Sequence, residues 1–99
     1  DLSAYDVLKA WNTGHPGGFC TIHADGCEDC LTRLELLIKE AVSSNNSTSD
    51  IQRLIGSTIG NIISIQKKAC DGKSFRLVDD MISIEGFDLQ KNCYLFSKV

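Results

Sequence analysis

The sequence has a single proline and no apolar run near the ~18 residues that a membrane-spanning helix needs. It also lacks an excess of positive charge. Its net charge of -3 argues against a protein that coats phosphate backbones, because that mode of binding needs a basic surface. Hydrophobic residues make up 42% and charged residues 23%, as in folded globular segments. We expect one soluble domain over residues 1–99, with no direct nucleic-acid binding.

Five cysteines cannot form a complete set of disulfides, and the sequence shows no basic and apolar leader. Both features favour a reducing, cytoplasmic location. The chain starts at Asp1 and not at a methionine, so we expect a processed chain or a fragment of a longer protein. Neither a G-x-x-x-x-G-K-[ST] loop nor a G-x-G-x-x-G motif is present. We therefore expect that the chain alone neither binds a nucleoside triphosphate tightly nor hydrolyses it.

Apolar spacing and capping residues predict three helices. The first covers residues 4–12, the second covers residues 26–42 with Asp25 as its cap, and the third runs from an Asp50 cap to about residue 59, weakened by Gly56. Residues 43–49 contain no apolar side chain and predict a solvated loop.

Short apolar and alternating segments predict four strands. One covers residues 19–23, and an antiparallel meander covers residues 61–67, 75–85 and 92–98, with a turn at Asp71 and Gly72. The order of elements indicates an α/β fold with a mixed sheet, parallel early and antiparallel late.

Polar residues gather between residues 13 and 25. Thr21, His23 and Asp25 follow the carboxyl end of the expected first strand, where ligand sites lie in open α/β sheets. With His15, they could supply a phosphate-sensing or proton-titrating group beside flexible glycine backbone. The alternative is that both histidines have structural roles, as a turn cap and as a partly buried imidazole.

A second pattern, C-x-x-H followed by C-x-x-C, is formed by Cys20, His23, Cys27 and Cys30. Its spacing would suit tetrahedral zinc. However, Cys20 and His23 would point to opposite faces of a strand, and Cys27 and Cys30 fall on the apolar stripe of the second helix. Core packing is favoured over a metal site, so we expect no structural zinc.

The remaining charged residues form no run. Arg33 and the lysines at 9, 67, 68 and 73 are separated in sequence, as is Arg76, and we interpret most of them as solvated positions without a basic groove. Asp79 and Asp80 are adjacent within an expected strand, and we interpret them as edge-strand charges that oppose aggregation.

Two strings carry a resemblance to a known family. The stretch D-V-L-K-A-W-N-T-G-H-P-G-G over residues 6–18, followed by T-I-H-A-D over residues 21–25, resembles the "His box" region of the type II/type IV secretion ATPases, above all the conjugative-transfer (TrbB-like) branch. Residues 31–35, 55–65 and 76–88 are similar to the segments that follow in that family.

The resemblance implies the C-terminal half of a RecA-like P-loop NTPase core. The complete protein would be a hexameric ATPase that uses ATP and Mg²⁺ to power conjugative transfer or type IV secretion. It would lie peripherally on the cytoplasmic face of the inner membrane and contact other secretion components. His15 and His23 would match the histidines of the His box, with Thr21 between them in phosphate sensing. The alternative function is a non-enzymatic interaction module, with or without a stabilising zinc ion.

Overall fold

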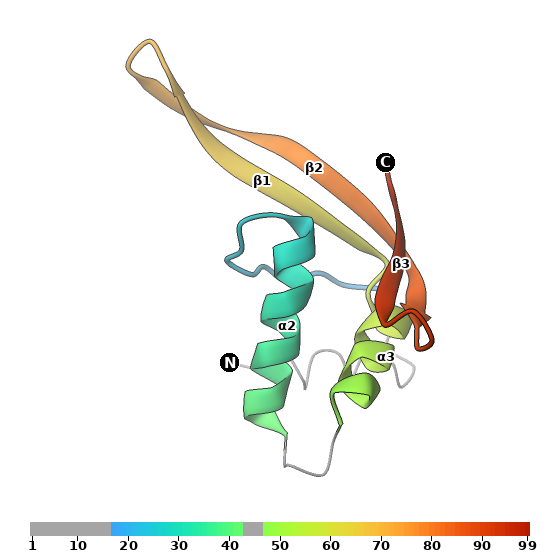
Figure 1. The fold of residues 1–99 in the computed structure, drawn as a ribbon. Helices are drawn as coiled ribbons and strands as arrows, with labels where there is room; N and C mark the ends of the chain where they lie inside the picture. Colours follow the sequence, from blue (N-terminus) through green and yellow to red (C-terminus); the bar gives the residue numbers. More distant parts are fainter. Residues whose placement is uncertain (1–16, 43–46) are drawn as a thin grey trace.

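The computed structural model describes residues 17–42 and 47–99. It contains helices α2 (Cys27–Ala41) and α3 (Thr48–Thr58) and strands β1 (Asn61–Cys70), β2 (Lys73–Asp88) and β3 (Cys93–Lys98). Both helices lie against one part of the sheet, while β1 and β2 continue beyond them as a two-stranded arm (Figure 1). The helix expected over residues 4–12 lies outside the described residues, as do loop positions 43–46. Within the described ranges, no helix is long and apolar enough to cross a membrane.

Helix α2 confirms the strongest helical pattern of the sequence. Its buried positions follow a helical period: Cys27, Leu31, Leu34 and Ile38. Leu37 of the same helix is 43% exposed, so the buried stripe of α2 is narrow. The expected Asp25 side-chain cap was wrong, because Gly26 occupies the N-cap position and no side chain caps the helix there.

Helix α3 starts earlier than expected. Ser47 is its N-cap, and the Ser47 Oγ accepts a hydrogen bond of 3.1 Å from the backbone N–H of Asp50. Asp50 is therefore inside the first turn, where its negative charge interacts favourably with the helix dipole. The prediction of Asp50 as the cap was wrong, since a serine three residues before it satisfies the free N–H group.

Gly56 has a packing reason inside α3. A Cβ atom at this position would lie 2.9 Å from the carbonyl carbon of Gly86 and 3.0 Å from the backbone nitrogen of Phe87. The absence of a side chain thus allows the backbones of α3 and β2 to approach closely. Glycine lowers the helix propensity of α3, but only glycine fits this close contact between the helix and the sheet.

The sheet has the order β1-β2-β3, and both pairings are antiparallel, which confirms the expected meander. Asp71 and Gly72 have φ values of 51° and 75°, as a two-residue hairpin turn of the primed type requires. The expected parallel part was wrong for the described residues, because residues 17–24 form no strand. A strand needs a backbone partner, and neither edge of this sheet pairs with that segment.

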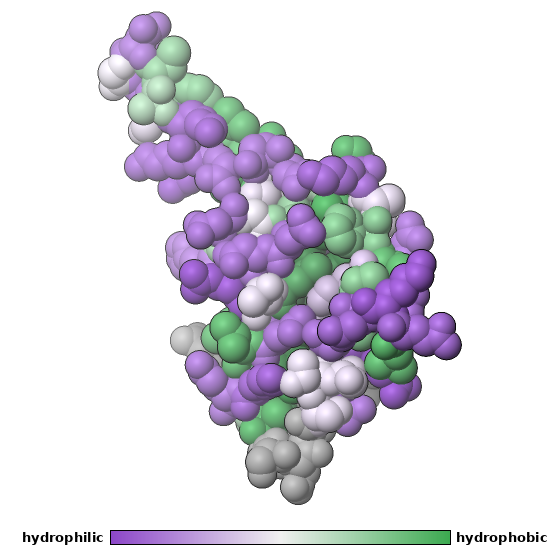
Figure 2. Space-filling model, viewed as in Figure 1, coloured by the Kyte–Doolittle hydropathy of each residue, from purple (hydrophilic) through white to green (hydrophobic). Residues whose placement is uncertain are grey.

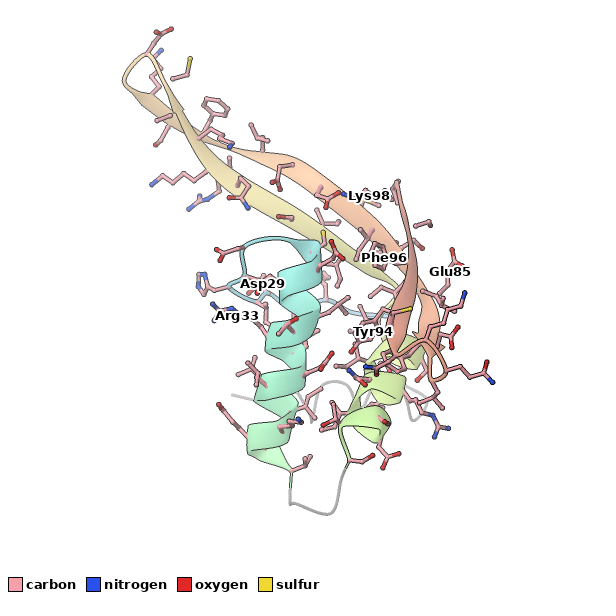
Figure 3. The ribbon with its side chains drawn as sticks, in the orientation of Figure 1. Asp29, Arg33, Glu85, Tyr94, Phe96 and Lys98 are labelled. Atoms are coloured by element: carbon pink, nitrogen blue, oxygen red, sulfur yellow. The ribbon has the colours of Figure 1, made fainter. Side chains whose placement is uncertain are left out.

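Strand β2 contains two bulges. Ser64 pairs with Asp80 and the next residue of β1 pairs with Val78, so Asp79 has no partner. A second shift in the β2–β3 register leaves Glu85 without a partner, and Figure 3 shows Glu85 on the side of the sheet away from α2. Each bulge moves the inward-facing positions of β2 by one residue.

Asp80 pairs with Ser64 of β1 but with no residue of β3. The first residue of β2 that pairs with β3 is Ile82. Its Oδ2 is 3.5 Å from the Lys98 Nζ, and its Oδ1 accepts a hydrogen bond of 2.9 Å from the Met81 N–H. The aspartate therefore occupies an open edge of the central strand, and its carboxylate engages the end of β3.

The core lies between the helices and the inner face of the sheet. Ile38 of α2, Ile55 of α3 and Ile82 of β2 are each 0% exposed. The Cys27 Sγ lies 3.5 Å from the backbone oxygen of Ile62 and donates to it. One aliphatic side chain from each of three elements thus meets at the centre of the domain.

Candidate functional site

The candidate site is the segment of residues 17–26, which precedes α2 and has no helix or strand (Figure 1). Exposure alternates along it: residues 21, 23 and 25 are exposed, whereas residues 22, 24 and 26 are half-buried. Ile22 packs against the core and fixes the segment to the body of the domain. Thr21 and His23 therefore share the solvent side, although the segment is not a strand.

The segment joins α2 through a short polar network. The backbone N–H of Asp25 donates to the Asp29 Oδ2 at 2.9 Å, and the Arg33 Nε approaches the same oxygen at 3.5 Å. Figure 3 shows Asp29 and Arg33 on the face of α2 away from β3. An acidic side chain in the first turn satisfies a free N–H group just ahead of the helix. The network fixes the direction in which the chain leaves His23.

Thr21 and His23 make no hydrogen bond or ion pair with any other described residue, so their polar atoms are available to groups outside this part of the chain. His15 lies outside the described residues. The sequence contains no G-x-x-x-x-G-K-[ST] loop that could supply a lysine and a cluster of backbone N–H groups. These residues alone do not fit a site that holds a triphosphate and its magnesium ion.

The expected core role of Cys27 is confirmed, since this side chain is 2% exposed. Cys30 is half-buried and packs against the same core, whereas Cys20 and His23 are exposed. Within residues 17–42 and 47–99, no three His, Cys, Asp or Glu side chains are arranged to hold a metal ion. Cys27 thus lies in the core, whereas Cys20 and His23 face solvent.

Burial also changes the chemistry of these thiols. Burial, then the neighbouring Cys27 and Cys20, and then Asp29 raise the pKa of Cys30 from 9.0 to about 11. Burial is also the main cause that raises the pKa of Cys27. A raised pKa lowers the fraction of reactive thiolate at neutral pH.

We therefore expect iodoacetamide at pH 8 to modify the exposed Cys20, Cys70 and Cys93 first. Because the thiolate fraction falls about ten-fold per pKa unit, Cys30 should react roughly 100-fold more slowly than a thiol of ordinary pKa. Mass spectrometry of peptides over a time course gives the order. Unfolding in urea should make all five thiols react alike, and equal rates for Cys20 and Cys30 in the folded chain would contradict the assignment.

A polar link connects the two helices with β3. The Tyr94 hydroxyl donates to the Glu35 Oε2 at 2.8 Å, and the Gln52 Nε2 donates to the Glu35 Oε1 at 3.3 Å. Burial and this hydrogen bond to Glu35 raise the pKa of Tyr94, so the phenol stays protonated. Tyr94 and Phe96 point from β3 toward α2 (Figure 3), where they line a shallow groove with Glu28, Leu31 and Thr32. The link holds the two helices and β3 together, and the groove lies between α2 and β3.

The structure confirms that the described basic residues of this set are exposed, but it also groups four of them. The turn at Asp71 and Gly72 brings together four cations that are separated in sequence, on the arm formed by β1 and β2: Lys67, Lys68, Lys73 and Arg76. All four are exposed. The sequence signal was the Asp-Gly turn itself, because a two-residue hairpin places residues before it opposite residues after it.

Comparison with known proteins gives three informative relatives. Conjugal transfer protein TrbB of Rhizobium radiobacter is 44% identical over 87 residues, which are 88% of this chain and 24% of that protein. Type IV secretion system protein VirB11 of Bartonella henselae is 34% identical over 74 residues, 74% of this chain and 20% of that protein. Type IV secretion system protein PtlH of Bordetella pertussis is 31% identical over 77 residues, 77% of this chain and 23% of that protein.

The chain thus spans about a quarter of the length of the curated relatives that it matches. No family model matches it, and no solved structure matches it.

Proposed function

Because this chain is homologous to a segment of conjugal transfer and type IV secretion proteins, which confirms the resemblance seen in its sequence, we propose that it is part of a secretion ATPase. In this proposal the chain is the C-terminal part of a RecA-like core. The longer protein assembles as a hexamer and hydrolyses ATP to power conjugative transfer or type IV secretion. It lies on the cytoplasmic side of the inner membrane, peripheral to it and beside other components of the system.

The observation that supports this function most directly is the 44% identity to a conjugal transfer protein over 88% of the chain. The position of the segment of residues 17–26 agrees with it. Thr21 and His23 are exposed beside one another, yet the described residues offer them no partner. Such side chains are suited to contact a ligand held by another part of a longer protein.

In the proposed function, His23 and Thr21 sense the terminal phosphate of ATP, and His15 belongs to the same His box. ATP and Mg²⁺ would be held by residues of the longer protein, and this chain alone would be inactive. Catalysis of phosphoryl transfer depends mainly on positioning and on stabilisation of charge, so a hydrogen-bonding side chain fits this role better than a nucleophile.

Replacement of His23 by alanine in the full-length protein should lower the rate of ATP hydrolysis about ten-fold or more. The change removes one hydrogen bond to a phosphoryl group that carries developing charge. The affinity for ATP should stay nearly unchanged, because most of the binding contacts lie elsewhere. Phosphate release measured over a range of ATP concentrations separates kcat from KM.

Cys27→Ala provides the matched control, since Cys27 is on the neighbouring helix and alanine also fits a small buried position. Its kcat should remain close to that of the parent protein. Full activity of His23→Ala, together with a folded but inactive Cys27→Ala protein, would reject the assigned roles. A full-length protein that does not hydrolyse ATP at all would reject the proposed function itself.

A further inference from the structure

The arm of β1 and β2 carries a concentration of positive charge that the composition conceals. Residues 66–76 hold four of the ten cations of the chain, with Asp71 as their single acid, although the whole chain has a net charge of -3. The arm extends beyond both helices, so its charge is displaced from the acidic body of the domain (Figure 1). The molecule is therefore electrically polarised, with its positive end on the arm.

Two of these cations oppose each other directly. Lys67 and Arg76 are Cα partners in the antiparallel register, so their side chains leave the same face of the arm. Like charges in this position destabilise a strand pair. Among the described residues, the ion pairs are Arg33 with Asp29 and Lys98 with Asp80, so none of the four arm cations is neutralised by a carboxylate. An anionic partner would relieve this repulsion.

Apolar side chains are interleaved with the cations. Ile65 and Val78 are also Cα partners, each is 59% exposed, and they lie two residues from Lys67 and Arg76 on the same face. On the opposite face Phe75, 46% exposed, is the partner of Lys68. Figure 2 shows hydrophobic and hydrophilic side chains next to one another along the arm. Both faces of the arm thus combine cationic and apolar groups.

We propose that this arm binds the surface of an anionic lipid membrane. The Lys67 and Arg76 side chains would lie at the level of the lipid phosphates, while Ile65 and Val78 on the same face enter the boundary between headgroups and acyl chains. The acidic body of the domain is repelled by the same surface, so the arm approaches first. Exposed aliphatic side chains gain by entering lipid, whereas contacts with the phosphates of a nucleic-acid duplex offer them little. The membrane is therefore favoured over nucleic acid.

The inference deepens the peripheral location in the proposed function by naming the surface that makes the contact. The test uses this chain without nucleotide, so it is independent of ATP hydrolysis. Vesicles of seven parts phosphatidylcholine to three parts phosphatidylglycerol are mixed with the protein, and the bound fraction is measured by flotation. Binding should be clear to these vesicles, should fall with added salt, and should be lost with pure phosphatidylcholine.

The decisive variant is Lys67→Ala/Arg76→Ala. Each cation near an anionic surface contributes about a five-fold factor in binding, so the double change should lower the partition coefficient about 25-fold. The matched control is Arg53→Ala/Lys91→Ala, which removes the same charge from exposed positions on α3 and on the turn before β3. The control should lose two-fold or less. Far-UV circular dichroism should show the same folded spectrum for both variants, because all four positions are exposed.

A second variant, Ile65→Ser/Val78→Ser, tests the apolar contribution and should lower binding at least five-fold at the same charge. Vesicle binding that persists in the arm variants would show that another surface binds the membrane. The peripheral location in the proposed function would then remain, but the arm would be rejected as the binding surface. Absence of vesicle binding by the unmodified chain would also reject the arm. Tighter binding to duplex DNA than to anionic vesicles at the same salt concentration would show that the surface has a different partner.

Discussion

Replacement of Ile82 by alanine should lower the free energy of unfolding by about 3 to 4 kcal/mol. Ile82 is 0% exposed and lies on β2, where that strand pairs on one side with Ile62 of β1 and on the other with Lys98 of β3. Alanine would remove buried methyl and methylene groups and leave a cavity that the surrounding strands and helices fill only in part. In a domain of this size, such a loss is a large fraction of the whole free energy of unfolding.

Ile63→Ala is the matched control for this change. Ile63 is the neighbour of Ile62 on β1, but its side chain points to the outer face of the sheet and is 53% exposed. The same substitution there should cost less than about 1 kcal/mol, because less apolar surface is removed from a packed environment. Urea unfolding followed by far-UV circular dichroism measures both. Equal losses for the two variants would show that the core does not lie on the inner face of the sheet.

Gly56→Val should lower the free energy of unfolding by about 3 kcal/mol, at the upper end of the cost of overpacking. The new side chain would start from a Cβ only 2.9 Å from the carbonyl carbon of Gly86. Since this neighbour is backbone, rotation of a side chain cannot relieve the contact, and α3 must move away from β2. The small gain in helix propensity from replacing glycine does not offset this displacement.

Gly60 allows a direct comparison with Gly56. It lies between α3 and β1, and a Cβ there would have no neighbour within 4 Å. Gly60→Val should therefore change stability by less than about 0.5 kcal/mol, as expected of a substitution away from packed contacts. Urea unfolding measures the change in the free energy of unfolding for both variants. A much larger loss for Gly56→Val than for Gly60→Val would show that α3 and β2 approach closely at Gly56. A stable Gly56→Val protein would mean that α3 does not pack this tightly on β2.

Local signals in the sequence predicted much of this fold. The apolar period of α2 and the Asp71-Gly72 turn depend on residues close together in the chain, and both are confirmed. The antiparallel meander followed from that turn and from the apolar strands on either side of it. Such features can be recognised from sequence because the interactions that determine them are local.

Features that depend on distant partners were not predictable in the same way. The two bulges of β2 arise from its pairing with two different strands, and no residue type in the sequence announces Asp79 or Glu85 as unpaired. The strand expected at residues 19–23 had an alternating pattern, but a pattern cannot provide the neighbouring strand that its backbone needs. Ser47 and Asp50 are both residue types that are favoured at a helix N-cap, so the sequence alone does not show which of them caps α3.

The candidate site could be predicted from the sequence only in part. The exposure of Thr21 and His23 is seen only in the structure, and their role in phosphate sensing comes from the resemblance and stays a prediction. The basic arm was missed because its four cations were considered along the chain and not across the turn. A hairpin doubles the local density of charge by placing two separated segments side by side.

The bulge at Asp79 has a consequence for insertions and deletions in the arm. It adds one residue to β2 only, and this offset brings Val78 to the same face as Ile65 and Arg76 to the same face as Lys67. Loss of that single residue would restore regular pairing and leave both pairs opposite each other, whereas loss of one residue between Asp79 and the turn would exchange the faces of the β2 positions beyond it. Insertions into the arm keep the residues beyond them on their faces only when they are matched on the two strands and even in number. The residue at the bulge can therefore be removed without moving a side chain of the arm to the other face, while any other single deletion in this part of β2 moves several.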